Sequence, residues 1–169
     1  HSTTDSSYTV AIGFEAMENT SSAGNAGNIA IGYRVMHVQT TGANNTAIGY
    51  AAMYNNSEAA RNTALGYKAM YSATDAAHDN VGIGLSALYT NTGGDKNVAI
   101  GNYALDANTT GGENVAIGYN SLSAVTTGAE NVAIGVNAGA QVTGDRGVFI
   151  GKGACPNATS SSKGVAIGH

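Results

Sequence analysis

The side chains of this chain that could bind a ligand recur at regular intervals. Aromatic residues follow a repeated glycine in several of these intervals, and we predict that they form the binding surface. They are Phe14, Tyr33, Tyr50, Tyr67 and Tyr119. Aromatic rings pack well on sugars, so a carbohydrate is one candidate ligand. The alternative is that the rings stack on one another and shield the edge of a sheet.

The histidines, acidic residues and cysteine do not form a metal-binding or catalytic pattern. His37 and His78 lie in return loops at different positions of the repeat, so one chain is not expected to bring them to one ion. Glu113 and Glu130 share one position of successive repeats, and carboxylates on loops are usually solvated. Cys155 stands where other repeats carry a buried apolar residue. We therefore expect no metal and no cofactor.

Enzymatic activity is not expected either. The sequence has no nucleophile elbow, no His-Glu-x-x-His motif, no P-loop and no carboxylate pair spaced as in a cleft. It has no basic stripe that would bind nucleic acid, and its net charge is −4. No run of about eighteen apolar residues occurs, so insertion into a membrane is not expected. Without catalytic residues, the chain is expected to have a structural or binding role.

A repeated phrase, Asn-Val-Ala-Ile-Gly and close variants, organises the whole chain. Its glycine returns about every seventeen residues, from Gly13 to Gly168. A fixed short period is typical of a solenoid, in which each unit buries its apolar face by stacking on its neighbours. We predict an all-β fold: a single-stranded parallel β-roll of about ten coils, forming one domain over residues 1–169.

Each coil is predicted to contain a strand, a glycine turn, a second short strand and a polar return loop. In one repeat, Val115 and Ile117 share a face of the strand while Ala116 faces the other way. Leu122 is the next apolar anchor, and Gly118 permits the turn between them. Equivalent residues of successive coils should then stack about 4.8 Å apart.

Two polar columns support this stacking. The position before the repeated asparagine alternates in charge except at Glu113 and Glu130, and it reads Arg61, Asp79, Lys96, Glu113, Glu130 and Arg146. Opposite charges on neighbouring strands are favourable. The asparagine column itself reads Asn28, Asn45, Asn62, Asn80, Asn97, Asn114 and Asn131. Stacked amides can hydrogen-bond along such a column.

The repeated phrase, from Thr9 to Gly168, resembles the head repeats of YadA-like trimeric autotransporter adhesins and repeats of bacteriophage tail fibres. The resemblance implies a left-handed β-roll and a homotrimer in which three chains pack side by side. The coils here are longer than the adhesin repeat, and the extra residues lie in the return loop. This difference favours the phage-fibre branch.

An oligomer is also expected because the roll has a thin core. We hypothesise that the small alanines of the strands, or the column of Met and Leu anchors, line the contact between chains. The candidates for trimer or core packing are Ala99, Ala116, Met53, Met70, Leu88, Leu105 and Leu122.

These observations predict a structural and receptor-binding segment of a homotrimeric fibre. The first expectation is a phage tail fibre in the virion that contacts the host cell surface, as a slice of a longer rod. Its partners would be further copies of itself and a cell-surface glycan or outer-surface protein. One alternative is the head of a bacterial trimeric autotransporter adhesin at the cell surface. The other is a tailspike that degrades capsule or lipopolysaccharide.

Overall fold

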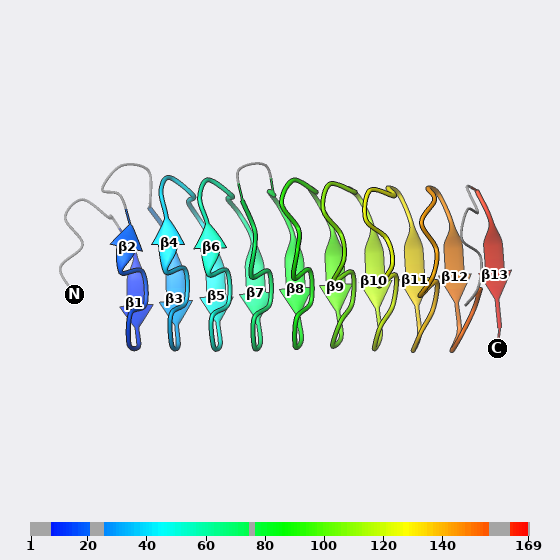
Figure 1. The fold of residues 1–169 in the computed structure, drawn as a ribbon, viewed down its shortest axis with the longest axis horizontal. Coiled ribbons are helices and arrows are strands. Elements are labelled where there is room, and N and C mark those ends of the chain that lie inside the picture. The colour runs from blue at the N-terminus through cyan, green and yellow to red at the C-terminus, as the bar shows by residue number, and fades with distance from the viewer. Residues whose placement is uncertain (1–7, 21–25, 75–76, 156–162, 169) are drawn as a thin grey trace.

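The protein is a rod made of coils stacked along one axis, with the described ends of the chain at opposite ends (Figure 1). The structure, a computed structural model, describes residues 8–20, 26–74, 77–155 and 163–168. Every regular element in these ranges is a β-strand. The fold confirms the prediction of an all-β parallel solenoid.

One face of the rod is a parallel sheet to which each coil contributes one strand. Within the described residues the sheet has ten strands, and they follow one another in chain order. They are β1 (Val10–Ile12), β3 (Ile29–Ile31), β5 (Thr46–Ile48), β7 (Thr63–Leu65), β8 (Val81–Ile83), β9 (Val98–Ile100), β10 (Val115–Ile117), β11 (Val132–Ile134), β12 (Val148–Ile150) and β13 (Val165–Ile167). Equivalent residues pair throughout, as Ile48, Leu65 and Ile83 do. The predicted stacking of the repeats is therefore confirmed.

A second short strand occurs in the first three coils. These strands are β2 (Asn19–Thr20), β4 (Val38–Gln39) and β6 (Asn55–Asn56), and they pair as a parallel three-stranded sheet. We predicted one in every coil, but from β7 onward the described coils have a turn there. In that turn the carbonyl of the anchor Leu105 accepts a hydrogen bond from the N–H of Asn108 at 3.2 Å. Such a bond between residues three apart bends the backbone away from a strand.

The core lies between the sheet and the column of anchors. The middle residue of each strand points inward, and Ala99 and Ala116 are fully buried. The anchors Met53 and Leu105 close the core from the other side and are fully buried too. Small alanines on one wall leave room for long side chains on the other, and each buried Met or Leu stabilises the roll by about 1.5–3 kcal/mol.

The glycine after each strand is required by two features at once. Gly118 has a φ of 133°, and residues other than glycine rarely adopt a φ in this region. A Cβ built on it would also overlap the backbone carbonyl of Gly135 in the next coil. The repeated glycine is therefore fixed by the close nesting of successive coils as well as by its turn.

The asparagine column joins each coil to the next. The side-chain amide of Asn97 donates to the carbonyl of Gly111 at 2.8 Å, across the core of its own coil. Its side-chain oxygen accepts the backbone N–H of Asn114, in the following coil, at 3.0 Å. Bonds between amide side chains also occur, as from Asn114 to Asn97 at 3.1 Å. The expected bonds between stacked amides are therefore present, and most of the column's bonds go to the backbone.

Near the C-terminal end, one aromatic residue fills the space that two other side chains occupy in the usual coil. Phe149 takes the place of the inward alanine and is 1% exposed. Gly139 stands where other coils carry Met or Leu, and a Cβ there would lie 2.9 Å from the Phe149 ring. Gly147 stands where other coils carry asparagine, and a Cβ there would overlap the same ring. The two glycines make the space that the phenylalanine fills.

Candidate binding surface

Four of the five predicted aromatic residues form one continuous ladder. Phe14, Tyr33, Tyr50 and Tyr67 stack with ring centroids 5.6, 4.9 and 5.0 Å apart. Phe14 is 64% exposed, and the rings of Tyr50 and Tyr67 are about half exposed. Tyr119 lies apart from this ladder and meets Tyr103 edge-on, at 6.0 Å between centroids. The column is interrupted between them because it carries Leu85 and Asn102 there.

The stacking changes what the ladder can offer to a ligand. Each inner ring has its faces turned to the rings of the neighbouring coils, so the edges of Tyr33 and Tyr50 are what remains exposed. A sugar cannot lie flat on a face that another ring covers. The ladder therefore offers ring edges and phenol groups, which suit polar ligands, and its two outermost ring faces.

A second aromatic ladder runs beside the first, and the sequence analysis missed it. His37, Tyr54, Tyr71 and Tyr89 stack at 5.1, 5.1 and 5.2 Å between ring centroids. Each of these residues directly follows a buried anchor, so the same repeat alignment could have revealed the column. Burial raises the pKa of the Tyr71 hydroxyl, Tyr54 and Tyr89 raise it further, and Lys68 lowers it.

A column of residues with positive φ separates the two ladders. It contains Glu15, Arg34, Ala51 and Lys68, with φ between 50° and 53°. The guanidinium of Arg34 lies 5.2 Å from the Tyr33 ring centroid and pairs with the carboxylate of Glu15. The hydrogen bond that Arg34 donates to that carboxylate raises the pKa of Arg34. The ammonium of Lys68 lies 5.4 Å from the Tyr67 ring and 5.5 Å from the Tyr71 ring.

The charged column before the asparagines forms ion pairs between neighbouring coils. Arg61 binds Asp79 at 2.6 Å, and Lys96 lies 3.3 Å from Glu113. Glu130, which follows Glu113 with like charge, is paired with Arg146 at 3.1 Å. The hydrogen bond from Arg61 lowers the pKa of Asp79. Exposed ion pairs of this kind contribute little to stability, and their main consequence is the pattern of charge on the surface.

The two internal histidines occupy different columns, and His37 is not in a return loop. It belongs to the second ladder, with Nδ1 3.7 Å from Glu18 and 4.0 Å from Glu15. These three side chains lie close enough together to hold an ion. However, Arg34 pairs with Glu15, and the Asn19 amide lies 2.9 Å from His37 Nε2. These contacts already engage two of the three groups.

The seven residues predicted for trimer or core packing all lie inside one chain. Each has no exposed surface: Ala99, Ala116, Met53, Met70, Leu88, Leu105 and Leu122. An enclosed side chain cannot contact another chain, so neither the alanine strip nor the Met and Leu column can line an interface. The inward direction of the alanines follows from the narrow core, which has no room for Val or Ile beside the anchors.

The outer side of the ten-stranded sheet is apolar and partly exposed. We call it the aliphatic face, and it consists of the first and third residues of each strand. Its members are Val or Ile except for Leu65, Thr46 and Thr63, and none is charged. Leu65 is 44%, Ile100 37% and Ile134 39% exposed. With ten strands about 4.8 Å apart, the face is roughly 43 Å long.

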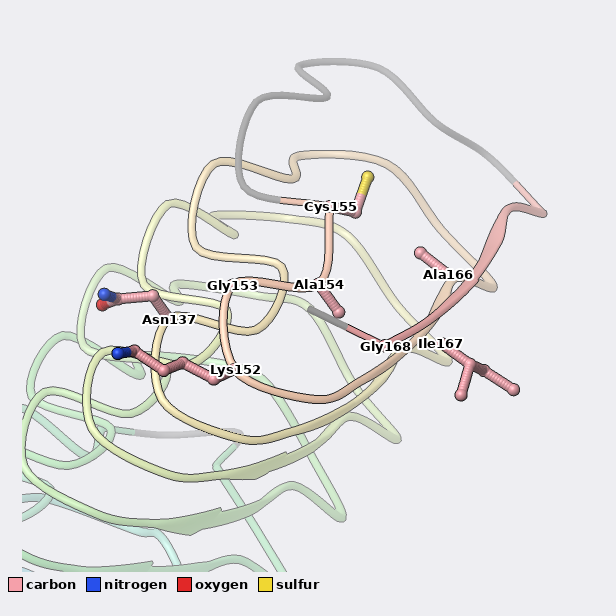
Figure 2. A pocket seen from close by; sticks show the side chains of 8 residues that line it. All are labelled: Asn137, Lys152, Gly153, Ala154, Cys155, Ala166, Ile167 and Gly168. Carbon is pink, nitrogen blue, oxygen red and sulfur yellow. The ribbon is translucent and has the colours of Figure 1, made fainter.

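Two hollows lie at the ends of the rod. One, of about 440 Å³, is bounded by Ala154, Cys155, Ala166 and Ile167 (Figure 2). Asn137 and Lys152 lie on the opposite side of this hollow from Ile167. Another, of about 210 Å³, lies over Phe14 and Glu15 in the first coil.

Comparison with protein-family models, with curated proteins and with solved structures finds no match for this chain. Among the residues that the structure describes, no helix is long and apolar enough to cross a bilayer.

Proposed function

We propose that the chain is a structural and receptor-binding segment of a homotrimeric fibre, a phage tail fibre that contacts the host cell surface. The observation that carries this proposal is the uncharged aliphatic face along the whole sheet. An apolar surface of this length favours burial, at about 25 cal/mol per Å². A fibre of several chains would provide that burial.

A second copy of this chain is the partner that fits the aliphatic face best. Its side chains form ridges at the spacing of the strands, and an identical chain carries the same ridges at the same spacing. The ridges of one copy can therefore fit between those of another along the entire rod. Three chains, left-handed coils and placement in a tail fibre rest on the resemblance of the Asn-Val-Ala-Ile-Gly repeat to such fibres.

In this proposal the receptor meets the surfaces that vary from coil to coil. The two aromatic ladders and the column between them are such surfaces, whereas the core columns stay nearly constant. Identical surfaces on three chains can bind the receptor at the same time, so weak single contacts give strong attachment overall. The proposed mechanism is display of repeated weak sites on a stiff rod, without catalysis and without a cofactor.

The head of a bacterial trimeric adhesin is the second candidate, because the same repeated phrase occurs in both kinds of protein. The flanking sequence of the full reading frame separates them. A coiled-coil stalk with a membrane anchor would favour the adhesin, and a self-cleaving chaperone domain would favour the phage fibre. Sugar release from capsule or lipopolysaccharide would instead favour a tailspike.

Sedimentation equilibrium tests the fibre proposal. The chain should sediment with three times its mass of 16.9 kDa. The double substitution Ile100→Glu and Ile134→Glu places charges on the aliphatic face and should give monomers. Thr127→Glu adds a charge to an exposed return loop and should leave the trimer intact. A chain that stays monomeric at high concentration, or a trimer that survives both isoleucine substitutions, would contradict the proposal.

A further inference from the structure

A third hollow lies on the side of the rod, between the two aromatic ladders. It has a volume of about 140 Å³, comparable to a single sugar ring, and it spans three successive coils. Its lining residues are Arg34, Tyr50, Ala51, Tyr54, Lys68 and Tyr71. All of them are on the surface that the fibre proposal assigns to the receptor.

The hollow exists because one position of a column carries a small residue. Ala51 occupies the position that holds Arg34 in the coil before and Lys68 in the coil after. All three have nearly the same backbone conformation, with φ of 50°, 51° and 53°. The missing side chain therefore leaves a gap with a cation on either side along the rod. At about 4.8 Å per coil, the backbones that carry the two cations are roughly 10 Å apart.

The charges around this gap are not balanced within the chain. Arg61, Lys96 and Arg146 each pair with a carboxylate of a neighbouring coil. Lys68 has no carboxylate within 4 Å among the described residues, and its ammonium lies against the rings of Tyr67 and Tyr71. A cation that lies beside aromatic rings keeps its hydrogen-bond donors free for an anion. Arg34 pairs with Glu15 but has further N–H donors.

We propose that this hollow binds a carboxylate-bearing sugar of an acidic polysaccharide that runs along the rod. The carboxylate would be held by the ammonium of Lys68, with Arg34 as a second donor, since charge-assisted hydrogen bonds are the strong ones. The phenol groups of Tyr50 and Tyr54 would meet the sugar hydroxyls. The coil spacing is close to the rise of one residue in an extended β-linked polysaccharide, so neighbouring sugars would pass neighbouring coils.

This inference rests on the proposed role at a cell surface, and calorimetry on the intact chain tests it separately. The probes are a β-1,4-linked mannuronate tetrasaccharide and the matching mannose tetrasaccharide, which lacks the carboxylates. The mannuronate probe should bind, and added salt should weaken its binding. The mannose probe should bind at least about tenfold more weakly, corresponding to the loss of a charged contact.

Variants locate the binding in the hollow. Lys68→Gln should weaken mannuronate binding about tenfold or more, and Lys68→Arg should retain it. Ala51→Arg should abolish binding because it fills the gap with a side chain that the column already accepts at Arg34. Lys152→Gln, which removes the same charge from an exposed lysine near the C-terminal end, should change nothing. Circular dichroism checks that each variant is folded.

Three results would overturn the inference: equal binding of the two tetrasaccharides, full affinity in folded Lys68→Gln, or equally tight binding of polyglutamate, which would indicate an acidic peptide instead. Failure here is distinguishable from failure of the fibre proposal. A trimer that does not bind mannuronate loses only the sugar site. A monomer whose mannuronate binding depends on Lys68 loses only the fibre.

Discussion

The N-terminal and C-terminal halves of the rod share one core but carry different surfaces. Coils through Tyr89 bear both aromatic ladders, the stacked cations and all three second strands. Later coils place Asn102 and Val136 at the first ladder position and have turns in place of the second strand. The ten-stranded sheet continues through both halves without a break in register. The core columns thus determine the coil, and the surface columns are free to differ.

The largest expected effect is the loss of stability when the repeated glycine is replaced. This loss should be the same in both halves, and unequal losses would contradict a shared core. Gly118→Ala in the C-terminal half and Gly49→Ala in the N-terminal half should each lower the free energy of unfolding by more than about 4 kcal/mol. Both residues have φ above 130°, and a Cβ on either would overlap the next coil's backbone. Urea denaturation measures the loss.

Gly153→Ala is the matched control for these glycines. Gly153 has a φ of 66°, and nothing lies within 4 Å of a Cβ built on it. We expect a loss of about 1 kcal/mol, the usual cost of a side chain at positive φ. A loss as large as that of Gly118→Ala would contradict the attribution of the larger effect to the φ near 133° and to the overlap with the next coil.

The next largest effect concerns a place where the C-terminal core departs from the repeat. Phe149→Ala should lower the free energy of unfolding by about 3–5 kcal/mol because it empties a fully packed space. Gly139→Leu alone should also destabilise, since its Cβ would lie 2.9 Å from the Phe149 ring. Combined, they restore the alanine and leucine of other coils, so the double variant should be more stable than either single one. Additive losses would disprove this compensation.

Asn97, in the asparagine column, and Asn108, a buried residue of the return loop, should respond differently to substitution. Asn97→Ala removes one hydrogen bond within its coil, to the Gly111 carbonyl, and one from the N–H of Asn114 in the next coil, and it should cost about 2–4 kcal/mol. Asn108→Val should cost less than about 1 kcal/mol. Asn108 Nδ2 donates to Asn91 Oδ1 and to the Gly111 carbonyl, but its Oδ1 is buried without a partner, and later coils carry Val125 and Val142 at that position. Chemical denaturation of both variants tests this ranking, and a larger loss for Asn108→Val would reverse it.

Removing an aromatic ring should have a smaller effect on stability, and this effect should differ between the two halves. Tyr50→Ala interrupts a ladder with a ring stacked on either side, and it should cost about 1 kcal/mol. Tyr119→Ala removes a ring with a single edge contact and should cost about half as much. Thermal unfolding of the two variants measures the difference. Equal losses would show that the ladder adds nothing beyond the contacts of individual rings.

The smallest effect is a pH dependence. Burial raises the pKa of the Asp106 carboxyl above its ordinary 3.8, so the folded chain holds this proton more tightly than the unfolded chain. The stability gained by protonation is present at low pH and is lost as pH rises from 3.8 through the raised value. Asp106→Asn should remove this dependence and raise the free energy of unfolding at neutral pH by at most about 0.5 kcal/mol.

Asp79→Asn should show the opposite sign. The hydrogen bond from Arg61 lowers the pKa of Asp79, so its stabilisation is present above the ordinary 3.8 and is lost as pH falls through the lowered value. The substitution should therefore destabilise slightly at neutral pH. Thermal unfolding across pH 2–7 compares the two variants, and a common sign for both would contradict these assignments.

Some of the candidate site could be predicted from the sequence because it follows the repeat. The ladder from Phe14 to Tyr67 was found in this way, since residues at equal positions of successive coils must stack. The second ladder was missed because His37 and the tyrosines after it were not aligned as a column. The hollow at Ala51 was missed for another reason: an absent side chain has no sequence signal until its neighbours on either side are placed.

The sequence by itself determined the coil, its register and its glycine turns, because a period of about seventeen residues brings the same side chain to the same place ten times. The direction in which the strands face was decided only by the tertiary structure. Alternation along a strand places Val115 and Ile117 together and opposite Ala116, and it does not say which side is inward. The space beside the Met and Leu anchors decides that, and it leaves the alanines buried and the larger aliphatic side chains outside.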